Sequence, residues 1–232
     1  MNLLVGQIGH LSIIIAFAAA LVAAYGYFQA SRGRALGAED PSWMRIARGA
    51  FFVHGAAVLS VIVCLFNIIH AHRYEYYYAW SHSSNHLPVQ YMISCFWEGQ
   101  EGSFLLWIFW HVVLGFCIMR FNRKWEAPVM AVFSGVQLFL VSMILGVVLG
   151  GVNVGSSPFI LLRDFLVDLP VFKMNPNFVP KDGTGLNALL QNYWMVIHPP
   201  TLFLGFALIS RGGRGHRPTV NQHRSHRRRR EE

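Results

Sequence analysis

Long apolar runs alternate with polar stretches along most of this chain. Spanning the hydrocarbon core of a bilayer takes roughly 20 mostly apolar residues. Four runs come close to that length or exceed it, at residues 3–28, 50–69, 104–119 and 129–151, and a fifth at 193–209 is barely long enough. The pattern predicts an all-α, polytopic integral membrane protein with about five transmembrane helices, in which residues 1–209 form one multi-spanning membrane domain.

Charged residues between the runs predict the topology. Positive charge in short loops marks the cytoplasmic side of a membrane. Two basic clusters follow the first and third runs: Arg32, Arg34, Arg45 and Arg48, then Arg120, Arg123 and Lys124. We therefore expect the N-terminus and two large loops, residues 70–103 and the stretch beyond Asn153, to face outward.

The hydrophobic pattern stops abruptly at Ser210. Residues 211–232 hold eight arginines against two glutamates, so they supply most of the net charge of +8. Such a composition predicts a disordered, basic, low-complexity tail over residues 210–232. It is either a natural cytoplasmic tail that meets anionic lipid headgroups or an out-of-frame end of a truncated chain. The change falls within a span, which favours the second interpretation.

The overall composition agrees with a membrane protein. Hydrophobic residues make up 54% of the chain and charged residues 13%, and the mean hydropathy is +0.39. The high pI belongs to the tail, so no nucleic-acid partner is expected. The three cysteines, Cys64, Cys95 and Cys117, form no C-x-x-C or C-x-x-C-H motif, and we expect them to be buried small hydrophobic residues. The start lacks the features of a cleaved signal peptide, so the first run is expected to be retained.

The first candidate site lies in "NYWMVIHPPTLFLGF", residues 192–206. Proline is tolerated in the first turn of a helix, so the fifth helix is expected to begin just behind His198, with Pro199 and Pro200 in its first turn. The imidazole of His198 would then lie at the outer membrane interface, where a ring nitrogen could bind a metal. On spacing alone, a helix-capping or interfacial histidine is the stronger alternative.

The second candidate site lies in "LPVQYMISCFWEGQEGSFLLW", residues 87–107. Glu98 and Glu101 are three residues apart and could act as an acid and a base, although acids more often cap a helix N-terminus. Trp97 and Trp107 fit an interfacial aromatic belt or a flat platform for a planar ligand.

The remaining histidines give weaker signals. A histidine inside a span is a functional candidate, but each of the three here lacks a partner one turn away on its helix. A zinc or copper site among the histidines of the first loop lacks paired spacing. The histidines inside the spans are His10, His54 and His111, and those of the first large loop are His70, His72, His82 and His86.

These two stretches resemble two motifs of the CcmF haem-lyase family of cytochrome c-type biogenesis proteins. Residues 87–107 resemble its "LPV-Y…W-G-x-E-G-S-x-L-L-W" motif, and residues 185–206 resemble its "LNPLLQ…HPP-L-LGY" motif. The order, separation and expected topology agree with the N-terminal portion of that family over residues 1 to about 209.

The resemblance implies a haem-handling subunit of cytochrome c maturation in the bacterial cytoplasmic (inner) membrane. His198 would be an outward, periplasmic axial ligand to a transient b-type haem, held in place by Pro199 and Pro200, with Trp97, Glu101 and Gly102 in support. The implied partners are the haem chaperone CcmE, a CcmH-type thiol subunit, apocytochrome c and membrane lipid.

The chain also departs from the family pattern. It has Glu98 and Gln100 where the family usually has a small residue and a histidine. Nothing matches the tryptophan-rich "WWD" segment, the second outward histidine or the paired intramembrane haem ligands, all of which come later in the family. Enzymatic activity therefore stays open. An inactive scaffold of the maturation complex is the main alternative, and a transporter-like permease is disfavoured because the spans lack midplane charges.

Overall fold

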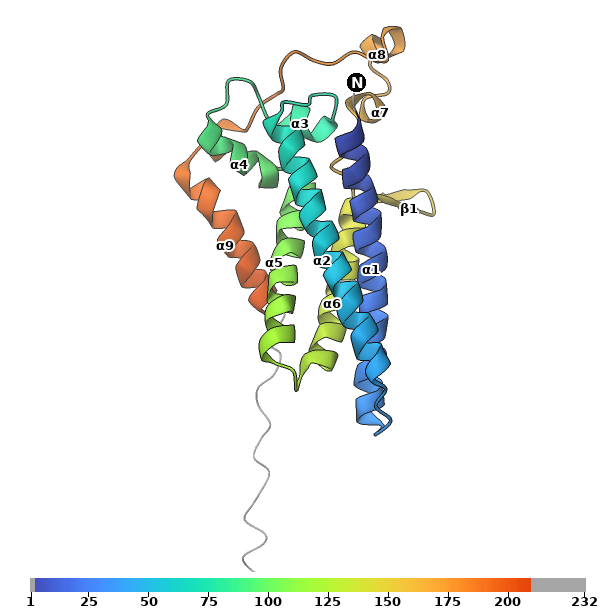
Figure 1. Ribbon diagram of the computed structural model, residues 1–232. Helices are drawn as coiled ribbons and strands as arrows, with labels where there is room; N and C mark the ends of the chain where they lie inside the picture. Colours follow the sequence, from blue (N-terminus) through green and yellow to red (C-terminus); the bar gives the residue numbers. More distant parts are fainter. Residues whose placement is uncertain (1–2, 210–232) are drawn as a thin grey trace, which may run out of the picture.

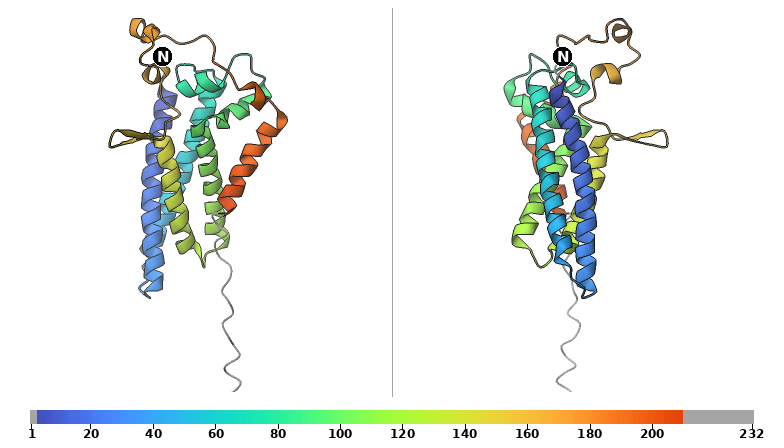
Figure 2. Two further views of the ribbon diagram at one scale, coloured as in Figure 1. Left: turned by 180° about the vertical axis from the view of Figure 1, so that it is seen from behind. Right: turned by 45° about the vertical axis from the view of Figure 1, so that its right-hand side comes forward.

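The computed structural model of the protein describes residues 3–209. Four long helices run side by side as a bundle (Figures 1 and 2), and each is long and apolar enough to cross a membrane. A shorter apolar helix leans against them. This arrangement confirms the expected helical, multi-spanning fold. The long helices are α1 (Leu4–Ala35), α2 (Pro41–His70), α5 (Gln100–Phe121) and α6 (Glu126–Leu145), and the short one is α9 (Tyr193–Ile209).

One end of the bundle carries both long loops and the start of α1 (Figure 1). The loops join through backbone hydrogen bonds, from the Leu162 N–H to the Glu75 carbonyl at 2.8 Å and from the Tyr77 N–H to the Ile160 carbonyl at 3.0 Å. At the other end, the described residues form the two short turns α1–α2 and α5–α6. The loops contain α3 (Tyr77–His82), α4 (Val89–Glu98), α7 (Leu162–Phe165), α8 (Pro170–Met174) and a 3₁₀ turn at Ala188–Leu190.

The first connection is much shorter than the sequence pattern predicts. Helix α1 continues to Ala35 and α2 begins at Pro41, so most of the arginine-rich stretch is helical. The Asp40 carboxylate caps α2 by accepting a hydrogen bond from the Ser42 N–H at 2.8 Å, and proline at the first helical position suits this start. Arginine near the end of α1 is favourable because the helix dipole is negative there.

The fourth span ends earlier than predicted. Helix α6 stops at Leu145, where Gly146 takes a left-handed φ of 71°. The chain then forms a small antiparallel hairpin from β1 (Val147–Leu149) and β2 (Val152–Val154), which projects from the side of the bundle (Figure 2). Gly150 and Gly151, with φ of 57° and 84°, supply the two positive φ angles that a tight two-residue hairpin loop needs.

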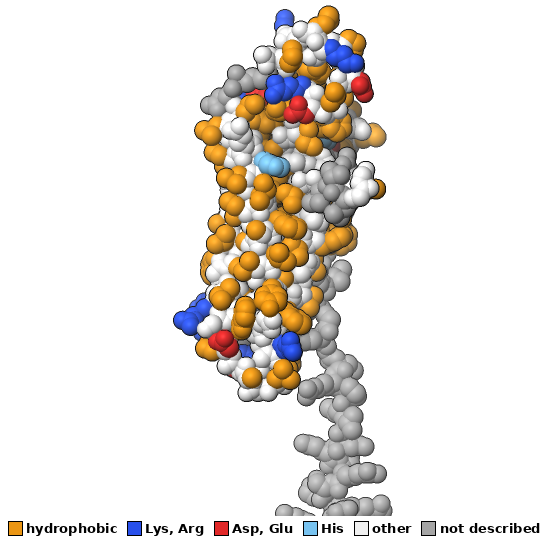
Figure 3. All heavy atoms as spheres, turned by 90° about the vertical axis from the view of Figure 1, so that its right-hand side faces the viewer, with side chains coloured by type: hydrophobic (Ala, Val, Ile, Leu, Met, Phe, Trp, Pro, Cys, Tyr) orange, Lys and Arg blue, Asp and Glu red, His pale blue; other side chains and the backbone are white. Residues whose placement is uncertain are grey.

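The outer surface has an apolar middle and charged ends. On the face shown in Figure 3, hydrophobic side chains cover the centre, while lysine, arginine and acidic side chains gather at the two ends. Because a bilayer core cannot solvate charge, this distribution fits a membrane-spanning bundle. Cys64 and Cys95 are buried, and all three cysteines are free thiols. The expected basic tail, residues 210–232, lies outside the described residues.

A buried ion pair joins two helices at the end with the short turns. Arg48 of α2 donates two hydrogen bonds to the Glu126 carboxylate of α6, each 2.6 Å long. Glu126 is fully buried, whereas the Arg48 side chain is 38% exposed. A two-pronged arginine–carboxylate contact is among the stronger polar interactions in proteins, so this pair fixes the register of α2 against α6.

Candidate functional site

The two sequence motifs meet around one cavity of about 340 Å³. It lies among α4, the start of α5 and α9, at the loop end of the bundle, and its lining is mainly apolar. The volume falls at the lower end of the range for small-molecule pockets, about 300–1,000 Å³. The lining residues are Ser94, Trp97, Glu98, Ser103, Leu186, Leu190, Met195, His198, Pro199, Leu202 and Phe203.

Helix α9 does not begin where the sequence predicts. It starts at Tyr193, five residues before His198, and both prolines lie inside it. An interior proline has no N–H for the carbonyl four residues earlier, so Pro199 leaves the Met195 carbonyl without its helical donor. The Trp97 indole N–H takes that place, at an Nε1-to-oxygen distance of 3.1 Å. At the first of the two prolines, a side chain from α4 thus replaces the missing backbone hydrogen bond.

His198 lies exposed at the edge of the cavity. Its backbone carbonyl accepts a hydrogen bond from the Thr201 hydroxyl at 2.8 Å. Across residues 3–209, its imidazole forms no hydrogen bond or ion pair. Both ring nitrogens are thus open to a ligand, as an imidazole that binds a metal requires.

Glu98, at the end of α4, also reaches the cavity. Its Oε1 accepts a hydrogen bond from the Asn187 N–H at 3.1 Å, and its Oε2 is buried with no partner among the described residues. Burial raises the pKa of the Glu98 carboxyl, and the Asn187 hydrogen bond opposes this only in part. The Ser94 hydroxyl is likewise buried without a described partner. Two unpaired polar atoms beside an apolar cavity mark it as a candidate binding site.

Glu101 and Gly102, two predicted supporting residues, do not line this cavity. Glu101 lies in the first turn of α5, where its charge suits the helix dipole. Gly102 is buried with no space for a side chain, because the Phe96 carbonyl and the Tyr78 hydroxyl occupy that position. It therefore permits a close approach of α4 to α5. Pro200 is also absent from the lining, whereas Trp97, His198 and Pro199 meet there.

None of the other candidate histidines is among the residues that line this cavity. His54 is buried, with Nδ1 at 2.9 Å from the Ala16 carbonyl, and His111 is buried beside the ring of Phe133. Within residues 3–209, no three or more histidine, cysteine or acidic side chains cluster as metal ligands would. The weak zinc or copper site considered in the first loop thus has no support in the described part of the chain.

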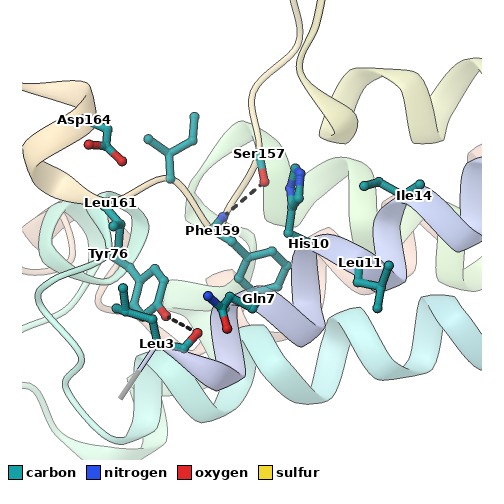
Figure 4. Close-up of a pocket in the computed structure, with 12 residues that line it drawn as sticks. Leu3, Gln7, His10, Leu11, Ile14, Tyr76, Ser157, Phe159, Leu161 and Asp164 are labelled. Carbon is teal, nitrogen blue, oxygen red and sulfur yellow. Dashed lines mark hydrogen bonds between the residues drawn. The ribbon is translucent and has the colours of Figure 1, made fainter. Parts of the chain in front are cut away.

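A second cavity, of about 540 Å³, lies at the loop end of α1. Figure 4 shows His10 beside Phe159 and Ser157, and the Tyr76 hydroxyl donating to the Leu3 carbonyl at 3.3 Å. Leucine, isoleucine and aromatic side chains form most of its wall, with His10, Tyr76 and Asp164 as the titratable groups. One histidine and one distant acid in an open apolar recess do not form an acid–base or metal-binding arrangement, so the cavity at His198 is the stronger candidate.

Comparisons of the sequence and of the structure with known proteins all lead to one family. The family model described as cytochrome c assembly protein matches residues 97–213, half of the chain. CcmF of Pseudomonas aeruginosa is 29% identical over 207 residues, 88% of this chain and 28% of its own. NrfE of Haemophilus influenzae is 28% identical over 195 residues, 82% of this chain and 26% of its own.

A solved structure shares the fold. The cytochrome c haem lyase CcmF superposes with a TM-score of 0.64 at 22% identity, over 89% of this chain and 28% of that one. The chain thus spans little more than a quarter of the length of the relatives it matches. It belongs to the cytochrome c assembly protein family and corresponds to the N-terminal portion of its CcmF-type members.

Proposed function

We propose that this chain is a haem-handling membrane subunit of cytochrome c maturation, in which the His198 imidazole would bind the iron of haem. The observation that carries the proposal is the position of His198, whose unpaired imidazole lies at the exposed edge of an apolar cavity. The names of its relatives, cytochrome c-type biogenesis proteins and a haem lyase, supply the identity of the ligand.

The residues of the cavity fit a flat, largely apolar ligand. Trp97, Leu202 and Phe203 offer apolar surface beside His198. Two buried polar atoms, Glu98 Oε2 and Ser94 Oγ, have no hydrogen-bond partner among the described residues. No lysine or arginine lines the cavity, so an acidic substituent of the ligand is expected to stay toward water. Haem, when bound, supplies the iron and the reactive vinyl groups.

The protein contributes position rather than acid–base chemistry. His198 holds the iron ligand position, the cavity wall excludes water from one side, and the α4–α5 corner keeps the wall in place. Fixing two reactants beside each other lowers the entropic cost of their reaction, and cofactor proteins commonly work in this way. The group that attacks the haem would come from apocytochrome c.

The further details of the proposal concern partners and location. The bound haem would be a transient b-type haem, received from the chaperone CcmE and passed to apocytochrome c beside a CcmH-type subunit. The N-terminus and the cavity would face the periplasm from the inner membrane. Positive charge at the opposite end, at Arg32, Arg34, Arg120 and Arg123, supports that orientation through the positive-inside rule.

The test is a haem absorption spectrum of the purified membrane protein. We would compare the wild type with His198→Ala, each with and without haem-loaded chaperone, and use His86→Ala as the control. His86 is an outer-loop histidine whose side chain is 91% exposed, so its loss removes an equally accessible imidazole away from the cavity.

We expect a Soret band in the wild type and in His86→Ala that is lost in His198→Ala. Identical spectra for all three proteins, or no band in any, would overturn the proposal. The chain would then be better described as a scaffold that carries the motif without binding haem.

A further inference from the structure

Two tryptophans attach α9 to the rest of the molecule, and they do so differently. Trp97 of α4 donates its indole N–H to the Met195 carbonyl. Trp107 of α5 contacts the rings of Phe203 and Phe206, at centroid distances of 6.1 and 5.6 Å. The buried Trp107 N–H has no hydrogen-bond partner in the described chain. The N-terminal part of α9 is therefore held by a hydrogen bond and the C-terminal part by ring packing.

The Trp97 contact meets the one carbonyl that Pro199 leaves unpaired. An unsatisfied carbonyl in a bilayer environment is costly, so proline and tryptophan are matched to each other. Met195 and His198 are three residues apart, which places them on the same face of a helix, one turn from each other. A bond at Met195 thus constrains the turn that carries His198.

Trp97 is itself fixed at its backbone. The Ser103 hydroxyl, from the first turn of α5, donates to the Trp97 carbonyl at 2.7 Å. The chain of contacts runs from α5 through Ser103 and Trp97 to Met195 of α9. Each step is a hydrogen bond of ordinary length, and none of them uses the Trp97 ring face.

We infer that Trp97 is a positioning residue, which holds His198 at the cavity by replacing the helical hydrogen bond that Pro199 removes. In this account the indole N–H, not the flat ring surface, is the functional group of Trp97. The two sequence motifs then act together, because the motif with Pro199 leaves the Met195 carbonyl without a donor and the motif with Trp97 supplies that donor. The inference rests on the proposed function only where it names His198 as the group being positioned.

The experiment is a double-mutant cycle of Trp97→Phe and Pro199→Ala in the full chain, with Trp107→Phe as the matched control. Phenylalanine keeps an aromatic ring but has no N–H. Alanine at position 199 restores a backbone N–H for the Met195 carbonyl. Two quantities are measured for each protein: amide hydrogen exchange of the α9 peptide, which needs no haem, and the haem affinity from the Soret band.

We expect Trp97→Phe to speed exchange in the first two turns of α9 and to weaken haem binding about five- to tenfold, as the loss of one hydrogen bond would. In the Pro199→Ala background, the same change should have a much smaller effect on both quantities, since the restored N–H can satisfy the carbonyl. Trp107→Phe loses no hydrogen bond, so it should leave exchange in those turns close to that of the wild type.

Two results would overturn the inference. One is unchanged exchange of α9 in Trp97→Phe, and the other is additive effects of the two substitutions, which would mean that tryptophan and proline act independently. If the wild type binds no haem, the proposed function fails, but the exchange cycle still decides whether Trp97 fixes α9. A ring-stacking role for Trp97 predicts the reverse pattern, with haem affinity reduced and α9 exchange unchanged.

Discussion

The two flanks of the molecule are held together by different means. Helices α1, α2 and α6 pack along most of their length through buried small residues such as Ala16, Ala20 and Ala47. Of the α9 side chains that the structure describes, Ala207 alone is buried, and Trp194 is 72% exposed. The bundle depends on extensive close packing, whereas the α9 flank depends on a few directed contacts. Substitutions on the α9 flank should therefore change the site without unfolding the protein.

The largest effect is expected at the buried ion pair of the bundle. Arg48→Ala leaves the fully buried Glu126 carboxylate without its partner, and breaking such a pair costs about 3–5 kcal/mol. The free energy of unfolding, measured with denaturant in detergent micelles, should fall by that amount.

Arg34→Ala is the control for this prediction. Arg34 pairs with Glu39 at 3.0 Å, but both side chains are well exposed, at 43% and 63%, and such pairs contribute at most about 1 kcal/mol. Equal losses in the two variants would contradict the distinction between an ion pair with a buried carboxylate and an exposed one.

A middle-sized effect is expected where the bundle meets the site. The Tyr78 hydroxyl donates to the Phe96 carbonyl at 2.8 Å and accepts from the Gly99 N–H at 3.3 Å. Tyr78→Phe strands both buried backbone groups, so we expect a loss of about 1–3 kcal/mol and a looser α4–α5 corner. Thermal unfolding followed by circular dichroism measures the loss. Tyr193→Phe, at a 66% exposed tyrosine, should stay within about 0.5 kcal/mol of the wild type.

The smallest effect concerns the pH dependence of stability at the cavity. Burial raises the pKa of Glu98 above its unfolded value of about 4.3. The stabilisation from its protonated form is thus complete below about pH 4.3 and is lost as pH rises through the folded pKa. Glu98→Gln should remove this loss and leave the protein slightly more stable than the wild type at neutral pH, as measured by the unfolding midpoint at several pH values.

Asp182 provides a control of opposite sign. The Asn85 N–H, and to a lesser degree the Gly183 N–H, hydrogen-bond to its carboxylate and lower its pKa. Its contribution is present above the unfolded pKa of about 3.9 and is lost as pH falls through the folded value. Asp182→Asn should therefore reduce stability at neutral pH. If both substitutions changed the stability at neutral pH in the same direction, the buried setting of Glu98 and the hydrogen-bonded setting of Asp182 would be contradicted.

Hydrophobic patterning was sufficient to predict the bundle but not its boundaries. Apolar length alone locates the spans. Arginines near the end of α1 look like a loop in the sequence, yet they suit a helix C-terminus. The run after Leu145 is as apolar as the helix before it, and a short apolar run does not distinguish helix from strand. The point where this apolar run changes from helix to hairpin depends on Gly146, Gly150 and Gly151, whose backbone angles only the folded chain reveals.

The sequence likewise pointed to only some of the residues that line the candidate site, because the folded backbone decides which side chains reach the cavity. The motifs identified His198 and Trp97, but they favoured Glu101, which matches the acidic residue of the family motif, over Glu98, which departs from the family pattern. Gly99, which separates α4 from α5, directs Glu98 to the cavity and leaves Glu101 in the first turn of α5. Proline rules alone placed the start of α9 too late, since they take no account of a hydrogen bond from a distant indole.

The close contact at the α4–α5 corner has an evolutionary consequence. The Tyr78 ring occupies the space beside Gly99 and Gly102 that a methyl group would need. A methyl group at Gly99 would become tolerable only after the Tyr78 ring is replaced, and a smaller replacement would lose the hydroxyl. At Gly102 the backbone carbonyl of Phe96 would still exclude a methyl group. Tyr78 and Gly99 should therefore diverge together in aligned relatives, as correlated substitution between α3 and the α4–α5 corner, whereas Gly102 should stay glycine whatever residue stands at position 78.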